Sequence, residues 1–428
     1  MGAPDRPRRI LLLITARTYR GEAFLQAAQR LGIEVVPVVD MADGLAQRWR
    51  YPLGVDFGQP QQAVARVVAY AREAPVDAVL AVDDSGTQLA AEIAAALGLP
   101  HNSPLAAAAA ADKHRMRSLM AAAGVPCPRF RLAWTGEDPQ ALAGEVDYPC
   151  VVKPLNLNGS RGVIRADDAA QFVAAVQRLA QVLHAQVLHA RVLHAQQPAA
   201  SHPYLVEDYI PGGEVALEGL LDRGELAVLA LFDKPDPLEG PFFEETIYVT
   251  PSRLPPETQT AITRCVAQAA RALGLQTGPV HAELRVNQAG PWLLEVAGRS
   301  IGGLCARTLR FGVGDSLEEL ILRQAVGMQL PSTAREQRAS GVMMIPIPEA
   351  GILKRVQGMD AASAVPGIEG VEITAKVDYP LVPLPEGDSY LGFIFARADT
   401  PAQVEDALRA AHACLHIAVM PELALHTL

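Results

Sequence analysis

The sequence predicts a protein of mixed α/β and α+β class, built from three consecutive units. In the first hundred residues, short apolar runs alternate with helical patterns, which is typical of a parallel sheet covered on both faces. From Tyr148 onward, strands follow one another across short turns, which indicates an antiparallel sheet. Beyond Pro331, short strands precede one last helix. We therefore expect units at residues 1–104, 105–330 and 331–428.

The first unit is expected to open with a buried strand at residues 9–16. Its apolar run is interrupted at Arg17 after about seven residues, which is short for a signal peptide. Ser103 can cap an alanine-rich helix at residues 105–123, which Gly124 ends. Between these segments we expect helices at 21–32, 61–73 and 86–98, and strands at 33–40 and 76–82.

The second and third units are expected to be rich in strands. Residues 148–164 indicate a strand, a glycine-rich loop and a second strand. Later strands of the second unit are expected at 204–209, 214–221, 225–232, 280–286 and 291–296. In the third unit we expect strands at 341–347, 370–375 and 390–396, and a helix at 401–412.

Composition limits the partners of the chain. Half of the 428 residues are hydrophobic, which is enough for a large core. The net charge is −10 and no block of Lys or Arg stands out, which argues against nucleic-acid and anionic-membrane binding. No apolar run approaches the roughly 18 residues of a spanning helix. Five cysteines without metal-binding spacing favour a reduced, cytoplasmic protein.

A perfect five-residue repeat, QVLHA, occupies residues 181–195 and contains His184, His189 and His194. Steps of five residues rotate each histidine by about 140° on a helix, so the three do not share one face. We interpret the repeat as an extension of a surface helix or loop, in preference to a metal site.

Lys153 and the loop that follows it form the first candidate phosphate site. The chain has neither a Walker A motif nor a G-x-G-x-x-G motif after the first strand. A lysine leaving a buried strand can place a fixed charge against a phosphate, and the loop offers backbone N–H groups. The alternative is an ordinary hairpin turn with a solvated lysine. The loop residues concerned are Asn158, Gly159, Ser160 and Gly162.

Residues 207–214 form a second candidate nucleotide site. The end of the strand, with Glu207, Tyr209 and Ile210, can present backbone groups to an adenine edge. Glu214 can accept hydrogen bonds from ribose hydroxyls. The alternative is the exit of a strand into a turn with solvated acids.

Glu283 and Glu295 form a candidate metal site. They lie in two apolar segments joined by a turn, and residue 289 is their midpoint. In a hairpin centred there, the two Cβ atoms lie roughly 4.5–5.5 Å apart on one face. Carboxylates so placed repel unless a cation lies between them, and Mg²⁺ prefers oxygen ligands. The alternative is an exposed pair that splays into water.

Arg299 follows directly, with Gly302 and Gly303 beside it, and can hold a phosphoryl or carboxylate group in a bidentate manner. The alternative is the start of a capped helix.

Residues 298–302 also match G-x-S-x-G, which in an α/β-hydrolase would make Ser300 the nucleophile, with a histidine such as His412 or His416 downstream. The antiparallel character of the preceding sheet argues against that rival.

In this order and spacing, the motifs resemble the ATP-grasp carboxylate–amine ligases. The resemblance implies a Rossmann-like domain, then an ATP-grasp fold over residues 105–330, then a small C-terminal α+β domain. It implies that Lys113 and Lys153 reach the ATP phosphates and that residues 158–162 form a mobile lid. Residues 207–210 would form the adenine hinge, with Glu214 at the ribose. Metal would be held by Glu283 and Glu295, and the transferred phosphate by Arg299.

Residues 278–285, GPVHAELR, resemble those of the L-amino-acid ligase group, as do residues 18–20 and 343–346. One position departs from the superfamily pattern, because Ala297 stands where an asparagine usually binds metal. Some amino-acid ligases also lack that asparagine. The number of metal ions is therefore left open.

The resemblance implies that ATP and Mg²⁺ (or Mn²⁺) activate a small carboxylate as an acyl phosphate, which an amine then attacks. Catalytic roles would belong to Arg299, Lys153 and His281. A homodimer is compatible with the resemblance. Three alternatives remain: another metabolic ligase or carboxylase of the same fold, a serine hydrolase, and a module that binds ATP without turnover.

Overall fold

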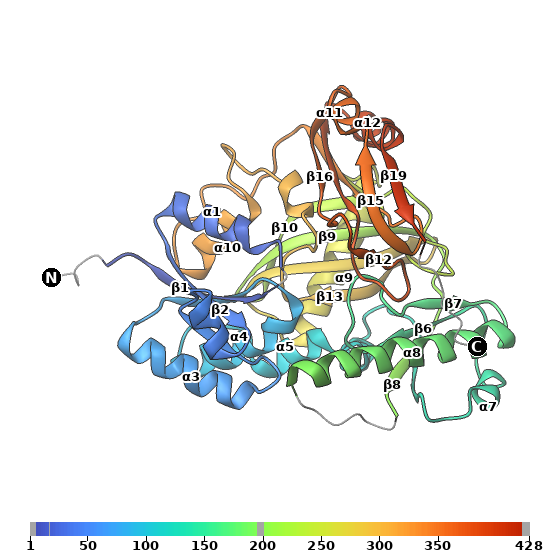
Figure 1. Ribbon diagram of the computed structural model, residues 1–428, viewed down its shortest axis with the longest axis horizontal. Coiled ribbons are helices and arrows are strands. Elements are labelled where there is room, and N and C mark those ends of the chain that lie inside the picture. Colours follow the sequence, from blue (N-terminus) through green and yellow to red (C-terminus); the bar gives the residue numbers. More distant parts are fainter. Residues whose placement is uncertain (1–5, 17, 195–200, 422–428) are drawn as a thin grey trace.

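The structure is a computed structural model that describes residues 6–16, 18–194 and 201–421, with side chains omitted for 187–194. Figure 1 shows the N-terminal region beside a central sheet, with the C-terminal region on the opposite side. The mixed α/β and α+β class predicted from the sequence is confirmed. Within the described ranges, none of the helices combines the length and apolar character that crossing a membrane requires.

The N-terminal region forms the expected parallel sheet, in the strand order β3-β2-β1-β4. Its strands are β1 (Arg9–Thr15), β2 (Glu34–Asp40), β3 (Leu53–Val55) and β4 (Ala78–Ala81). Its helices are α1 (Gly21–Leu31), α2 (Asp43–Arg48), α3 (Pro60–Glu73) and α4 (Asp84–Leu97). The short elements α2 and β3 were not expected, because neither is long enough to show a period in the sequence.

The single helix expected at residues 105–123 is wrong. Two helices, α5 (Pro104–Ala111) and α6 (Lys113–Ala122), replace it. Asp112 between them is extended, with φ −116° and ψ 112°, and its side chain accepts a hydrogen bond from the Arg115 N–H at 2.9 Å. Asp112 thus caps a new helix, a preference that competes with continuing the old one. The break places Lys113 at the first turn of α6.

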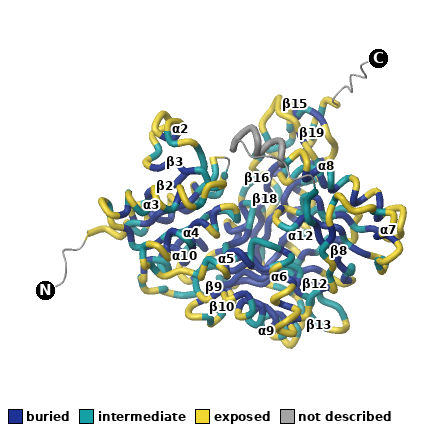
Figure 2. Tube along the Cα trace, turned by 90° about the horizontal axis from the view of Figure 1, so that it is seen from below, coloured by how far each residue is buried: buried dark blue, intermediate teal, exposed yellow. Residues whose placement is uncertain are grey.

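Eight antiparallel strands form the central sheet, in the order β13-β12-β9-β10-β11-β14-β18-β16. Every residue of β9 except its two ends is buried (Figure 2). The last three strands in this order come from the expected third unit and continue the same sheet. The expected unit boundaries at 104/105 and 330/331 stay predictions. The strands are β9 (Gly213–Asp222), β10 (Glu225–Lys234), β11 (Ile247–Thr250), β12 (Gly278–Asn287), β13 (Gly290–Ala297), β14 (Ala339–Ile345), β16 (Ile368–Ile373) and β18 (Gly392–Ala398).

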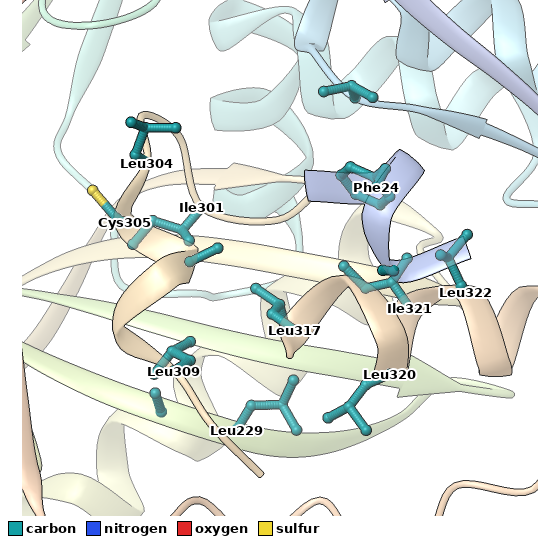
Figure 3. Close-up of a cluster of buried hydrophobic side chains, with 14 of the residues drawn as sticks. Phe24, Leu229, Ile301, Leu304, Cys305, Leu309, Leu317, Leu320, Ile321 and Leu322 are labelled. Carbon is teal, nitrogen blue, oxygen red and sulfur yellow. The ribbon is translucent and has the colours of Figure 1, made fainter. Parts of the chain in front are cut away.

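Two unexpected helices cover this sheet, α9 (Pro256–Leu273) and α10 (Leu317–Ala325). Figure 3 shows Phe24 of α1 beside Ile321 of α10, within a cluster that also contains Leu229 of β10. This cluster joins the N-terminal region to the central sheet, because burying shared apolar surface is the main force that holds such units together. It therefore fixes the position of α1, and of β4 just before α4, relative to the strands that carry the site.

A second antiparallel sheet, ordered β5-β8-β6-β7, packs against the long helix α8 (Ala169–His194). Residues 181–194 of the QVLHA repeat lie in the second half of this helix, and residue 195 lies outside the described residues. His184 is exposed, and the side chains of His189 and His194 lie outside the described part. The sheet consists of β5 (Phe130–Trp134), β6 (Cys150–Pro154), β7 (Ile164–Ala166) and β8 (Pro203–Asp208). The short helix α7 (Pro139–Ala143) shares a hydrophobic cluster with α8 and this sheet.

The remaining C-terminal elements form a small third layer beyond the central sheet. The strands of this layer pair in the order β17-β15-β19. Its elements are β15 (Gly351–Gln357), β17 (Pro380–Leu381), β19 (His416–Met420), α11 (Met359–Ser363) and α12 (Pro401–Ala413).

Candidate active site

A cavity opens between the β5-β8-β6-β7 sheet and the central sheet. The strands β6, β8, β12 and β13 contribute to its walls, together with the loop after Lys153. Most of the expected site residues line it. They are Lys113, Lys153, Asn158, Gly159, Ser160, Glu207, Tyr209, Ile210, Glu214, His281, Glu283, Glu295 and Arg299.

Gly162 does not line the cavity. Its backbone is left-handed, with φ +72°, and a Cβ atom there would come within 2.9 Å of Leu179 Cδ1. Its N–H donates to the carbonyl of Pro385 at 2.9 Å. The glycine therefore serves close packing of the loop against α8 and a C-terminal segment, because only a residue without a side chain fits there.

Glu207 lies among cations. Lys153 Nζ is 2.6 Å from its Oε2 atom, and Arg117 Nε is 2.8 Å from its Oε1 atom. Burial raises the pKa of Glu207, but Arg117 and Lys153 outweigh it, so the pKa is below its ordinary value. The Glu207 side chain is thus paired with two cations. An adenine edge could hydrogen-bond only to the backbone of residues 207–210. Arg117 was missed, although its spacing of four residues from Lys113 places both on one face of α6.

Lys153 is buried, and burial lowers its pKa to about 8 despite the opposing charge of Glu207. The ammonium therefore loses its proton as the pH rises through about 8, whereas a bound phosphate favours the charged form. We expect the Kd of a non-hydrolysable ATP analogue to increase above pH 8 in the wild type. In Lys153→Arg the Kd should stay level to pH 9, because arginine keeps its charge. Calorimetric titration from pH 6.5 to 9.5 tests this, and equal slopes for both proteins would contradict it.

Glu214 is held by Lys234 Nζ at 2.7 Å and by Arg285 Nε at 3.2 Å. Oxygen atoms of Glu214, Glu245 and Glu283 lie within 4.8 Å of one another, and Lys234 contacts all three carboxylates. Burial, and then the charge of Glu283, raise the pKa of Glu245. Glu245 was missed because it lies between strands, in a segment without a periodic pattern. The cluster is an acidic wall of the cavity, and Lys234 is the cation that its three carboxylates share.

Glu283 and Glu295 are cross-strand partners, as the sequence predicts. The turn is centred half a residue earlier than expected. A bulge at Leu294 shifts the pairing by one residue, so the expected pairing holds from Glu283 away from the turn. The side chains are 25% and 30% exposed and both face the cavity, so they do not splay into bulk water. His281 Nε2 lies 3.5 Å from Glu283, and Lys113 Nζ lies 3.4 Å from Glu295. Two carboxylates facing one cavity are a donor set that fits a hard cation such as Mg²⁺.

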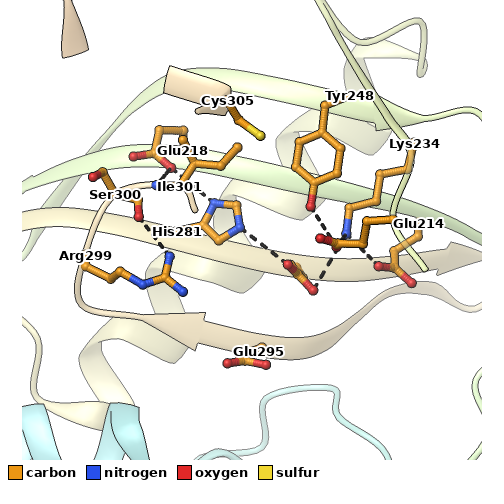
Figure 4. A network of polar contacts seen from close by, with 12 residues as sticks. Glu214, Glu218, Lys234, Tyr248, His281, Glu295, Arg299, Ser300, Ile301 and Cys305 are labelled. Atoms are coloured by element: carbon orange, nitrogen blue, oxygen red, sulfur yellow. Dashed lines mark hydrogen bonds and ion pairs between the residues drawn. The ribbon is translucent and has the colours of Figure 1, made fainter. Parts of the chain in front are cut away.

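His281 is oriented by a carboxylate that the sequence did not reveal. Glu218 is fully buried; its Oε2 atom lies 3.1 Å from His281 Nδ1 and accepts a hydrogen bond from the Ile301 N–H at 3.0 Å. Figure 4 shows His281 between Glu218 and the acidic wall. A carboxylate on Nδ1 fixes the tautomer, which directs Nε2 of the neutral ring toward the cavity.

Arg299 lies on the loop after β13 and contacts Asp84 at 2.7 Å. The adjacent Ser300 is 4% exposed, and its Oγ atom accepts a hydrogen bond from Arg20 at 2.7 Å. The hydrolase alternative is wrong, because β13 pairs antiparallel and a short 3₁₀ turn (Cys305–Thr308) replaces the helix that should follow the nucleophile.

A second cavity adjoins the first. Its walls include Tyr19 and Arg20 of the N-terminal region, together with Cys305 and Tyr390. The two cavities share the following residues: Asn158, Gly159, Glu245, His281, Glu283 and Arg299. A molecule in either cavity would therefore meet the other at these side chains.

Comparison with known families assigns three stretches of the chain. Residues 25–101 match the ATP-grasp N-terminal domain, residues 146–308 match the ATP-grasp domain, and residues 343–420 match the L-amino acid ligase C-terminal domain 2. Each stretch falls inside one of the three expected units.

Individual relatives agree with these matches. The chain is 25% identical over 425 residues to the uncharacterised protein y4rH of Sinorhizobium fredii (strain NBRC 101917 / NGR234), covering 99% of this chain and 85% of that protein. It is 27% identical to alanine–anticapsin ligase of Bacillus subtilis (strain 168), over 62% of this chain and 58% of that enzyme. The crystal structure of L-amino acid ligase from Bacillus licheniformis matches with a TM-score of 0.80 and 25% identity, over 97% of this chain and all of that one.

Proposed function

This chain belongs to the ATP-grasp ligases, and on that premise we propose that it activates the carboxylate of an amino acid as an acyl phosphate and joins it to an amine. ADP and phosphate would be the other products. The observation that carries the proposal is the junction of the two cavities at Arg299, Glu283 and Glu245. Nucleotide in the first cavity would present its γ-phosphate there to an acid in the second.

Transfer of a phosphoryl group depends on charge neutralisation and alignment more than on covalent chemistry by the protein. Lys113 and Lys153 would neutralise the ATP phosphates, and Arg299 would hold the transferred group. Mg²⁺ or Mn²⁺, when bound, would neutralise phosphate oxygens, with Glu283 and Glu295 as its ligands. The side chain of Ala297 offers no ligand atom, so we propose Glu245 of the acidic wall as a further ligand of the metal.

The second step needs an amine without its proton, because only the free base is a nucleophile. We propose that His281 accepts this proton at Nε2, the nitrogen that Glu218 leaves free.

The acyl phosphate must be kept from water, so the loop at 158–162 is proposed to close over it. In the structure this loop already contacts the C-terminal region, where Arg161 lies 3.8 Å from Asp388 and Gly162 donates to Pro385. The C-terminal region would thus support the closed position of the lid.

Analysis of the nucleotide products tests the proposal. With ATP, Mg²⁺ and pooled L-amino acids, each omitted in turn, we expect ADP and phosphate only when amino acids are present. AMP and pyrophosphate would contradict the acyl-phosphate step. ADP formed with bicarbonate in place of amino acids would favour the carboxylase alternative. A homodimer and a cytoplasmic location remain predictions, for sedimentation and fractionation to test.

A further inference from the structure

We propose that Asp84 is a positioning residue for Arg299, so that the N-terminal region completes the place where the acyl phosphate forms. This rests on the function proposed above. Asp84 is the first residue of α4, and its Oδ2 atom lies 2.7 Å from an Nη atom of Arg299. The side chains are 24% and 12% exposed, respectively, so the pair is only partly screened by water.

The loop that carries Arg299 holds its side chain weakly without this contact. The backbone carbonyl of the adjacent Ser300 accepts a hydrogen bond from Arg299 Nη1 at 2.8 Å. Arg299 Nε has no hydrogen-bond partner among the described residues. A guanidinium has five N–H donors. Asp84 and Ser300 engage two of its nitrogen atoms, which leaves donors for an anion in the cavity. Asp84 can therefore orient the guanidinium without competing for all of it.

A second guanidinium makes this orientation necessary. Arg20 lies on the same cavity wall, bonded to the Ser300 Oγ atom at 2.7 Å and to the Val82 carbonyl at 2.6 Å. Burial, and then the charge of Arg299, lower the pKa of Arg20, which records the repulsion between the two. Burial also disfavours the charge on Arg299, but Asp84 outweighs it and raises that pKa. Without Asp84, Arg299 would be driven away from Arg20.

The neighbouring Asp83 provides a matched control. It also lines the second cavity, but it accepts hydrogen bonds from the hydroxyls of Thr15 and Thr18, each at 3.2 Å. Its nearest described cation is Arg20, at 3.7 Å. The two aspartates thus share a helix start and a charge, and they differ in which arginine they face.

Steady-state ADP formation by the full chain tests the proposal. We expect Asp84→Asn to lower kcat by about 10- to 100-fold, the cost of a misplaced catalytic group, while KM for ATP changes by less than about threefold. Asp84→Glu should recover part of kcat, and Asp83→Asn should change it less than Asp84→Asn does. In an Arg299→Ala background, Asp84→Asn should have little further effect, because it acts through the arginine.

Multiplicative losses in the double variant would overturn the proposal, as would a normal kcat for Asp84→Asn. Urea unfolding of the wild type, Asp84→Asn, Arg299→Ala and the double variant provides a readout without turnover. Non-additive effects on the free energy of unfolding are expected if the pair exists, and additive effects would overturn it. A wild type that forms no ADP with any acid would instead contradict the proposed function, and with it the catalytic consequence of Asp84. That failure is distinct, because the unfolding cycle would still record the pair.

Discussion

The Glu295→Gln variant is expected to lose ADP formation by at least about 10³-fold while its fold remains intact. Its carboxylate faces Glu283 across the hairpin in the nucleotide cavity, so the amide removes half of the charge that would balance a divalent cation. The fold should survive, because the side chain is 30% exposed and its described ion pair, with Lys113, is long at 3.4 Å. Coupled assay of ADP over a range of Mg²⁺ concentrations measures the effect.

Glu225→Gln is the control, because Glu225 is an exposed carboxylate at the start of β10 in the same sheet. Its turnover should equal that of the wild type. Unfolding midpoints within about 2 °C of the wild type are expected for both variants, because neither change touches the core. Near-normal ADP formation by Glu295→Gln would show that the carboxylate pair does not hold the metal.

The pairing of Glu283 with Glu295 could be predicted because a hairpin is a local structure. Two apolar segments with a short turn between them fix the register to within one residue, and the bulge at Leu294 made the expected register right from Glu283 outward. Lys153 and the glycine-rich loop were found for the same reason, since strand, lysine and loop are contiguous.

Residues brought in by tertiary packing could not be predicted. Nothing in the first hundred residues marks Asp84 as the partner of Arg299, because that contact depends on how α1 packs against α10. Glu218 is a single acidic residue in the mostly apolar middle of β9, and nothing in that sequence gives it a partner until β12 places His281 beside it. The prediction of one continuous helix across Asp112 failed for a different reason. The alanine-rich run favours a continuous helix, and the competing cap at Asp112 is not evident within it.

The strongest stability effect is expected for Lys234→Met. The lysine side chain is 2% exposed and contacts Glu214, Glu245 and Glu283, and its Nζ atom lies 4.8 Å from the centre of the Tyr248 ring. Removing the ammonium leaves three carboxylates close together without their shared cation. Breaking a buried ion pair from one side costs about 3–5 kcal/mol of unfolding free energy, which urea denaturation measures.

The cause of that loss can be tested by pH and by metal. Burial raises the pKa of Glu245 and of Glu283, so their carboxylates oppose folding as pH rises above the unfolded value of about 4.3. The loss in Lys234→Met should therefore be larger at pH 8 than at pH 5. Mg²⁺ should stabilise the variant by about 2.7 kcal/mol at 100 times its Kd. At the same Mg²⁺ concentration it should stabilise the wild type less, so that part of the loss is restored, because the divalent ion replaces the missing cation.

Lys354→Met is the matched control for this experiment, because Lys354 forms a 2.6 Å pair with Asp378 and is 43% exposed. Its loss should stay within about 1 kcal/mol and should not respond to Mg²⁺. If Lys234→Met behaved like this control, the acidic wall would tolerate its own charge without a cation. The ligands proposed for the metal would then have no electrostatic reason to bind one.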